Sequence, residues 1–147
     1  MPQPVRVRGK KNCGTGADIT SDAGSNFLIY WNAGDLRSTL NGTSLPGGVD
    51  TSGTSGSNGT KNTPTLTADL LGDWREELVA RETSHAALRV YTTTAVSKRR
   101  IYTLMHDPTY RAQVSFEQSS HNQPPHPREF KIGTGMADPP KPDIYVR

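Results

Sequence analysis

Turn-forming residues recur throughout this chain and leave little room for long helices. Fourteen glycines and eleven prolines are spread over its 147 residues. Hydrophobic residues make up 32% of the chain, below the roughly 45–50% apolar content of typical soluble domains. Such a composition favours short strands joined by turns, and these bury only a thin core. We therefore predict an all-β fold of antiparallel strands.

Apolar segments of strand length lie between the turn signals. Residues 27–31 form a continuous apolar run, typical of a strand that is buried on both faces. Leu88 and Val90 alternate with their neighbours at the two-residue period of a strand. Strands are expected at residues 27–31, 65–70, 77–81, 87–93, 100–106 and 111–118, with turns at Asn41-Gly42, Gly72-Asp73 and Asp107-Pro108. At most one short helix is expected, near residues 35–40.

Composition divides the chain into three parts. Residues 1–25 match no motif, although the alternation of valine and arginine at 5–8 is compatible with an edge strand. Residues 26–140 hold the main strand pattern, and residues 141–147 form a tail. The stretch 42–60 is almost wholly small and polar, so it should be a long surface loop. Such a loop is either functional or a mobile linker between structural units.

Charge and cysteine content restrict the classes of partner. The formal net charge is +3, and the basic residues form only two short groups, at positions 6–11 and 98–100. These groups are too sparse for a nucleic-acid surface but suit weak attraction of a polyanion. Cys13 is the only cysteine, which excludes an intramolecular disulfide. No apolar run is long enough for a membrane span or a signal peptide.

Six strings of residues occur in the order typical of one enzyme family. They are SNFLIYW, NGTKNTP, ADLLGDWREE, ALRVYTTT, RIYTLMHDPTYR and NQPPHP. Residues 26–140 thereby resemble the C-terminal portion of the rhamnogalacturonan lyases of the YesW/YesX type (polysaccharide lyase family 11). These are secreted bacterial β-propeller enzymes that cleave the rhamnogalacturonan backbone of pectin. The resemblance implies an extracellular protein whose partner is a plant cell-wall polysaccharide.

The resemblance also raises a question of size. A propeller blade takes about 40–50 residues, so 147 residues supply about three blades of a closed ring that needs more. The implied fold is the last two to three blades of an incomplete propeller. Exposed blade edges would favour self-association.

The family chemistry is β-elimination at a galacturonosyl unit. A base removes the proton at C5, the glycosidic oxygen at C4 leaves, and a cation neutralises the neighbouring carboxylate. The resemblance points to Lys61 as the base or the cation, because it follows Asn58, Gly59 and Thr60, which are associated with sugar contact. An ordinary solvated lysine is the alternative.

Two further positions carry weaker expectations of sugar binding. Gln118 and Ser120 stand where relatives commonly have asparagine and alanine, and both departures weaken that role. Relatives also commonly read W-D-G-D-L-L-R-E-L where residues 31–39 read WNAGDLRST. Acidic positions of that string are replaced here, so any ion or sugar contact made by them would be weakened.

A cluster of carboxylates suggests calcium, for which the family is known. Asp69, Asp73, Glu76 and Glu77 lie within nine residues around a strand break, and calcium prefers several oxygen ligands. His126 belongs to the NQPPHP string and could face a calcium-bound water. Turn capping by Asp73 and ion pairing of Glu76 with Arg75 or Arg81 form the competing structural explanation.

Three functional readings remain open on the sequence. The chain is a lyase-derived domain, a noncatalytic carbohydrate-binding module, or a truncated product without an independent role. In the second reading, aromatic side chains would be stacking surfaces for sugar rings, and the candidates are Trp31, Trp74, Tyr91 and Tyr110. Formation of an unsaturated product from rhamnogalacturonan separates the first reading from the second.

Overall fold

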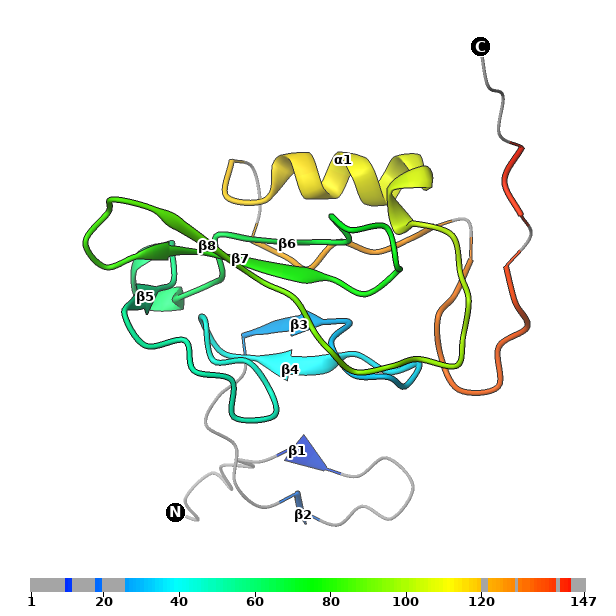
Figure 1. Ribbon diagram of the computed structural model, residues 1–147, viewed down its shortest axis with the longest axis horizontal. Coiled ribbons are helices and arrows are strands. Elements are labelled where there is room, and N and C mark those ends of the chain that lie inside the picture. Colours follow the sequence, from blue (N-terminus) through cyan, green and yellow to red (C-terminus); the bar gives the residue numbers. More distant parts are fainter. Residues whose placement is uncertain are drawn as a thin grey trace, which may run out of the picture.

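The computed structural model describes residues 10–11, 18–19, 26–119, 122–128, 130–139 and 141–143. Its described strands form three antiparallel sheets (Figure 1). Two are pairs, of β1 (Lys10–Lys11) with β2 (Asp18–Ile19) and of β3 (Phe27–Ile29) with β4 (Ser38–Leu40). The third contains β5 (Thr54–Ser55), β6 (Leu66–Ala68), β7 (Glu77–Glu82) and β8 (Leu88–Tyr91). Helical elements are η1 (Gly59–Lys61), η2 (Leu104–His106) and α1 (Pro108–Phe116).

Strand β7 is the centre of the four-stranded sheet. Val79 is the register partner of Leu66 in β6 and of Val90 in β8. Further along the strand, Arg81 pairs with Ser55 in β5. Strands β5 and β6 therefore lie end to end along one edge of β7, and β8 follows the other edge. The polar loop at 42–60 thus contributes a strand of its own to the sheet.

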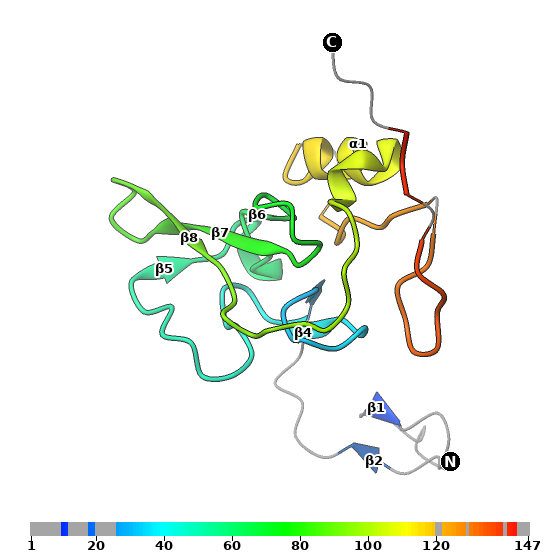
Figure 2. The same ribbon diagram turned by 45° about the vertical axis from the view of Figure 1, so that its right-hand side comes forward.

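The run at residues 27–31, which holds β3 and the two residues after it, supplies side chains to two separate hydrophobic clusters, because neighbouring residues of an extended chain point to opposite faces. Ile29 and Trp31 join the cluster that also holds Leu40, Leu45 and Leu78. Tyr30 joins the cluster of Trp74, Ile101, Leu104, Tyr110 and Ile132. In both ribbon views the β6–β7 sheet lies between α1 and the β3–β4 hairpin (Figures 1 and 2). The expected burial of residues 27–31 on both faces is confirmed.

The strand expected at 111–118 is wrong, because this segment belongs mainly to α1. Asp107 caps the helix: its Oδ1 accepts hydrogen bonds from the amides of Thr109 (2.8 Å) and Tyr110 (2.9 Å). Pro108 occupies the first helical turn, where its missing N–H has no cost. The Asp-Pro pair that predicted a turn is therefore a helix start.

The structure also differs from the expected strand at residues 100–106 and the expected short helix near residues 35–40. Residues 100–106 pair with no described strand and end in η2 instead. The short helix near residues 35–40 is absent from the structure, which places β4 at the end of that stretch. Thr103 begins η2 by accepting a hydrogen bond from the Met105 amide. Local capping thus decides against continued strands in this half of the chain.

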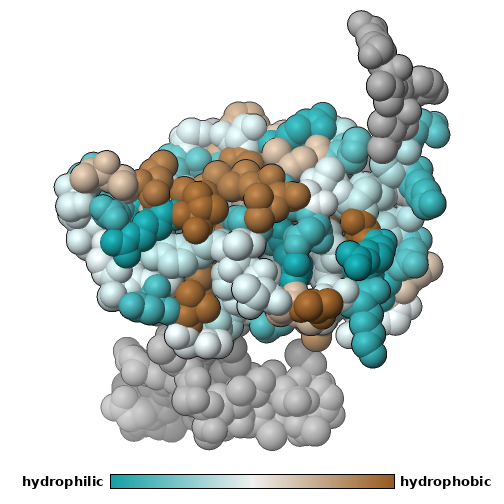
Figure 3. Space-filling view, viewed as in Figure 1, coloured by the Kyte–Doolittle hydropathy of each residue, from teal (hydrophilic) through white to brown (hydrophobic). Residues whose placement is uncertain are grey.

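The sugar-stacking surfaces proposed for a binding module are mostly core residues. Trp31, Trp74 and Tyr110 are buried, and Tyr91 is half-buried. By contrast, Leu88 is 63% exposed and Val90 is 60% exposed, both on the free edge strand β8. Figure 3 shows apolar surface over this part of the sheet. Within the described residues, no helix has the length and apolar character needed to cross a membrane.

Candidate functional site

Lys61 lies in a tight turn whose backbone explains the Asn-Gly-Thr-Lys string. It ends η1, and both flanking residues, Asn58 (φ 63°) and Asn62 (φ 48°), adopt the left-handed conformation. Gly59 also has a positive φ. Asparagine and glycine enter this region at lower cost than other residues. The string therefore forms a compact projection that leaves the Lys61 side chain exposed.

Asn26 fixes this turn to the start of β3. Its side-chain amide donates to the backbone oxygen of Lys61 and to that of Asn62, the latter at 3.3 Å. Its Oδ1 accepts a hydrogen bond from the Gly42 amide at 3.4 Å. One side chain thus ties together three segments that are distant in sequence. The position of Lys61 depends on this amide.

Lys61 and a group of amide side chains line a cavity of about 610 Å³. We call this cavity the amide pocket, and its other lining residues are Asn26, Asn41, Asn62, Thr63, Asn122 and Gln123. Lys61 is the only charged side chain among these described lining residues. The Oδ1 atom of Asn122 is buried and has no hydrogen-bond partner among the described residues. Amides and one cation suit a ligand with hydroxyl groups and a negative charge.

The structure separates the predicted sugar-binding residues. Asn58 and Gly59 shape the turn but are absent from the described lining of the amide pocket. Gln118 donates from Nε2 to Thr63 Oγ1 (3.0 Å) and to the Pro64 carbonyl (2.6 Å), so it supports the pocket wall. The backbone of Thr60 lies in η1. Ser120 lies outside the described residues.

Sequence reasoning did not single out Asn26, Asn41, Asn122 or Gln123 as site residues. A signal for three of them was present, because Asn26 lies in the SNFLIYW string and Asn122-Gln123 begin NQPPHP. Their roles emerge only when β3, β4, η1 and the segment after α1 meet around one cavity.

Replacing Gly56 with alanine is expected to distort the amide pocket. A Cβ at Gly56 would collide with the Asn62 side-chain amide and lie 2.9 Å from the Thr63 backbone oxygen. We expect a loss of about 1–3 kcal/mol in the free energy of unfolding, as for other overpacked sites. Denaturant unfolding measures it. Gly34→Ala is the matched control, because a Cβ there meets nothing within 4 Å; equal losses in both variants would contradict the prediction.

Asp69 organises the turn between β6 and β7 and its contact with η2. Its Oδ1 accepts from the Gly72 amide (2.9 Å), and its Oδ2 accepts from Thr103 Oγ1 (2.8 Å) and from the Leu104 amide (2.7 Å). Burial raises the pKa of Asp69, and these three donors oppose the rise. This carboxylate therefore links two loops through hydrogen bonds.

Glu76 is the centre of a buried polar network. Its Oε2 accepts from the Tyr30 amide (2.8 Å), and its Oε1 accepts from Tyr110 OH (2.8 Å) and Arg37 Nη2 (3.2 Å). The Arg37 guanidinium also lies over the Tyr30 ring, 4.3 Å from its centroid. Burial raises the pKa of Glu76, while the neighbouring Arg37 charge lowers it. The expected pairing of Glu76 with Arg75 or Arg81 is wrong, because Glu76 pairs with Arg37 and Arg75 pairs with Asp73.

The remaining predicted metal ligands also have local partners. Glu77 accepts from the amides of Leu70 (2.8 Å) and Leu71 (3.1 Å) through Oε2. Asp73 accepts from the Arg75 amide (3.1 Å) and forms an ion pair with its guanidinium. His126 is exposed, and its backbone amide donates to Gln113 Oε1 at 2.8 Å.

The amide, hydroxyl and guanidinium groups that contact the four carboxylates point their hydrogens at the oxygens that a bound cation would need. Across the described part of the chain, no three His, Cys, Asp or Glu side chains are grouped so that they could hold a metal ion. The arrangement of Asp69, Asp73, Glu76 and Glu77 therefore fits a structural network better than a metal centre. Calcium binding stays a prediction.

A fifth carboxylate, Glu117, holds α1 against β6. Its two oxygens accept from the Thr67 amide (2.8 Å) and the Thr67 hydroxyl (3.0 Å). Burial raises the pKa of Glu117 to about 8, although the two hydrogen bonds from Thr67 lower this pKa. Glu117 was not among the predicted site residues, because nothing in the neighbouring sequence distinguishes it from a surface glutamate.

Comparison with known proteins places the whole described site in one family. The family model "Rhamnogalacturonan lyase family 11, C-terminal domain" matches residues 8–142. The chain is 44% identical over 156 residues to the rhamnogalacturonan endolyase YesW of Bacillus subtilis, covering 98% of this chain and 25% of YesW. It is 52% identical over 89 residues to the rhamnogalacturonan exolyase YesX of the same organism, covering 60% of this chain and 14% of YesX.

Solved structures agree with the sequence comparisons. The YesW structure superposes with a TM-score of 0.74 at 43% identity, over 90% of this chain and 24% of YesW. A rhamnogalacturonan lyase from Bacillus licheniformis gives a TM-score of 0.76 at 41% identity, over 89% of this chain and 24% of that protein. The chain thus spans about a quarter of the length of these relatives. It belongs to rhamnogalacturonan lyase family 11 and corresponds to the C-terminal domain of that family.

Proposed function

We propose that this domain supplies the amide pocket and Lys61 to the cleavage of rhamnogalacturonan by β-elimination. The proposal rests on the cavity of about 610 Å³. Among the described residues that line it, Lys61 alone is charged. Lys61 has no hydrogen-bond or ion-pair partner for its ammonium group among the described residues, so the group is available to a ligand. Relatives that are named as rhamnogalacturonan lyases support the choice of substrate.

The chemistry assigns separate tasks to the lysine and the amides. Amide groups of Asn41 and Asn122 would pair with sugar hydroxyls and orient the ring, while Asn26 holds the Lys61 turn in place. Lys61 would take the C5 proton as a neutral amine or, when charged, hold the uronate carboxylate. The C5–H electron pair then forms the C4–C5 double bond while the C4–oxygen bond breaks. The pair of that bond leaves with the glycosidic oxygen, which takes a proton from water. Calcium remains a proposed cofactor that rests on the family resemblance alone.

Lys61→Met is expected to weaken the interaction with rhamnogalacturonan while leaving the fold intact. The change removes the ammonium group and keeps most of the stem, so a charge-assisted contact worth about 1.5–3 kcal/mol is lost, or roughly 10- to 100-fold in affinity. If Lys61 is the base, turnover falls by roughly a further 100-fold or more. Calorimetry with rhamnogalacturonan oligosaccharides and the absorbance of the unsaturated product measure the two effects.

Lys141→Met is the matched control, because Lys141 is exposed and lies outside the described lining of the amide pocket. Equal affinity and turnover in the two variants would remove Lys61 from the site. Binding without any product by the unaltered chain would favour a noncatalytic binding role.

We also propose that the sheets are blades of a β-propeller that additional polypeptide completes, in a protein that acts outside the cell. Strand β8 is an unpaired edge in the described structure, with exposed Leu88 and Val90. Such an edge is normally covered or paired. A partner strand from the remaining three quarters of a lyase, or from a second copy, would bury these side chains.

A further inference from the structure

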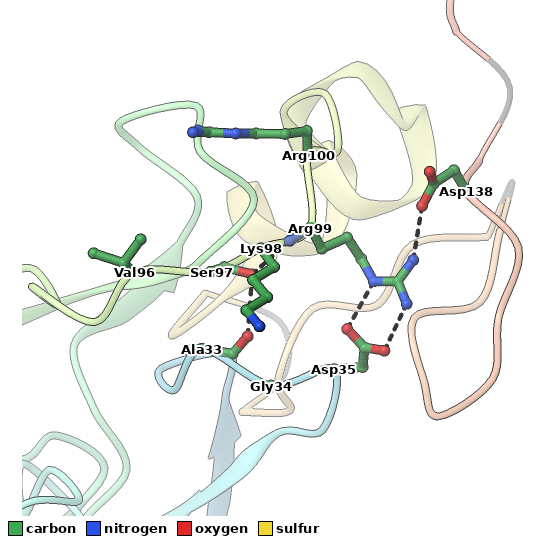
Figure 4. Close-up of a pocket in the computed structure, with 9 residues that line it drawn as sticks. All are labelled: Ala33, Gly34, Asp35, Val96, Ser97, Lys98, Arg99, Arg100 and Asp138. Carbon is green, nitrogen blue, oxygen red and sulfur yellow. Dashed lines mark hydrogen bonds and ion pairs between the residues drawn. The ribbon is translucent and has the colours of Figure 1, made fainter.

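A second hollow lies at the opposite end of the β3–β4 hairpin from the amide pocket. It consists of two adjoining cavities of about 680 and 300 Å³, which share Val96, Ser97, Arg99 and Arg100. The turn at residues 33–35 lines the larger cavity (Figure 4). Residues 72–75 line the smaller one. We call this combined hollow the basic groove. It shares no described lining residue with the amide pocket.

Arg99 is fully occupied and shapes the groove. Its Nε and Nη2 atoms each lie 2.7 Å from an oxygen of Asp35, and its Nη1 lies 2.7 Å from Asp138. Figure 4 shows Arg99 between these two carboxylates. This guanidinium therefore joins the hairpin turn, the segment after β8 and the C-terminal segment. It has no pair of N–H groups left to bind the carboxylate of a ligand.

Lys98 and Arg100, on either side of Arg99, are the available cations. Both are exposed, and neither has a hydrogen-bond or ion-pair partner within the described part of the chain. In Figure 4, Arg100 points away from the Arg99–Asp35 pair, and Lys98 extends beside the turn that carries Ala33. The two charges therefore stand on the wall of the hollow without compensation.

Arg75 adds a half-buried and incompletely satisfied guanidinium to the smaller cavity. One nitrogen pairs with Asp73, while the buried Nη1 has no partner among the described residues. A buried donor without an acceptor costs about 1–3 kcal/mol. A carboxylate is the ligand that a guanidinium fork fits best, through paired and charge-assisted hydrogen bonds. The groove thus presents two exposed cations with free donors, Lys98 and Arg100, beside the buried and unpaired Nη1 of Arg75.

We propose that the basic groove binds a carboxylate-bearing sugar of an acidic polysaccharide, such as a galacturonate unit, separately from the amide pocket. The inference rests on the proposed function for the class of polymer, and on Arg75, Lys98 and Arg100 for the site. The hairpin register places Asn26 and Asn41 at one end of β3–β4 and residues 33–35 at the other. A long chain that engages both sites gains avidity from the second contact.

Amide chemical shifts of the ¹⁵N-labelled chain, titrated with digalacturonate, test this proposal. We expect shifts at residues 72–75 and 94–101, and no shifts there with a neutral disaccharide of galactose. The double variant Lys98→Gln/Arg100→Gln is expected to weaken the groove response at least 10-fold. The double variant Arg111→Gln/Lys131→Gln loses the same charge at exposed positions outside the groove and should retain the response.

The two sites fail or succeed independently in this experiment. Shifts confined to residues 61–63 and 122–123 would overturn the groove and leave the proposed function standing. Shifts confined to the groove, unchanged by Lys61→Met, would support the groove and count against the amide pocket. No response at residues 72–75 and 94–101, or an equal response to the neutral sugar, would overturn carboxylate recognition there. Matching circular dichroism spectra establish that the variants are folded.

Discussion

Replacing Glu76 with glutamine is expected to lower the free energy of unfolding by about 3–5 kcal/mol. Glu76 is fully buried and accepts hydrogen bonds from Tyr30, Tyr110 and Arg37. Glutamine keeps the shape but places an NH₂ group against one set of these donors and leaves the Arg37 charge uncompensated. Removing one partner of a buried pair costs far more than the intact pair contributes.

Thermal and urea unfolding at neutral pH measure this loss. A change of this size corresponds to roughly 10 °C or more in Tm for a domain of this length. Glu82→Gln is the matched control, because Glu82 pairs with Arg89 at the surface, where an ion pair contributes about 0–1 kcal/mol. Equal losses in the two variants would show that the Glu76 network is not a major source of stability.

The second large effect concerns pH and Glu117. Its pKa is about 8 in the folded protein, against an ordinary value of 4.5. Between these values the folded chain holds a proton that the unfolded chain has released. The stabilisation is therefore fully present below about pH 4.5 and is lost as pH rises through 8. The size of the pKa rise corresponds to about 3–5 kcal/mol in the free energy of unfolding.

Glu117→Gln isolates this contribution. The amide resembles the protonated carboxyl and keeps both contacts with Thr67, with its oxygen accepting from the amide and its NH₂ donating to the hydroxyl. We expect variant and parent to be similar near pH 4.5 and the variant to be more stable by a few kcal/mol near pH 8.5. Urea unfolding across this range measures the difference. Parallel stability curves for the two proteins would contradict it.

Most of the sheet could be predicted from local pattern. The apolar run at 27–31 and the alternation of Leu88 and Val90 correspond to β3 and β8, because side-chain period and turn residues are local properties. The family followed from short strings, and Lys61 was located by its string. The segment at 111–118 failed because strand and helix patterns are hard to separate in a short apolar stretch. The Asp107-Pro108 cap was the signal that decides between them.

Tertiary structure alone decided what the polar residues do. Asp69, Glu76 and Glu77 looked like metal ligands in sequence, yet folding surrounds Glu76 with donors from Tyr30 and Tyr110, 46 and 34 positions away. The raised pKa of Glu117 arises likewise from burial against Thr67, 50 positions away. The amide pocket needs segments around Asn26, Lys61 and Asn122 to meet. Periodicity and turn chemistry depend on neighbouring residues and so predicted most of the strands, and the short residue strings carried the family resemblance. Burial and hydrogen-bond partners depend on distant segments and were decided by packing.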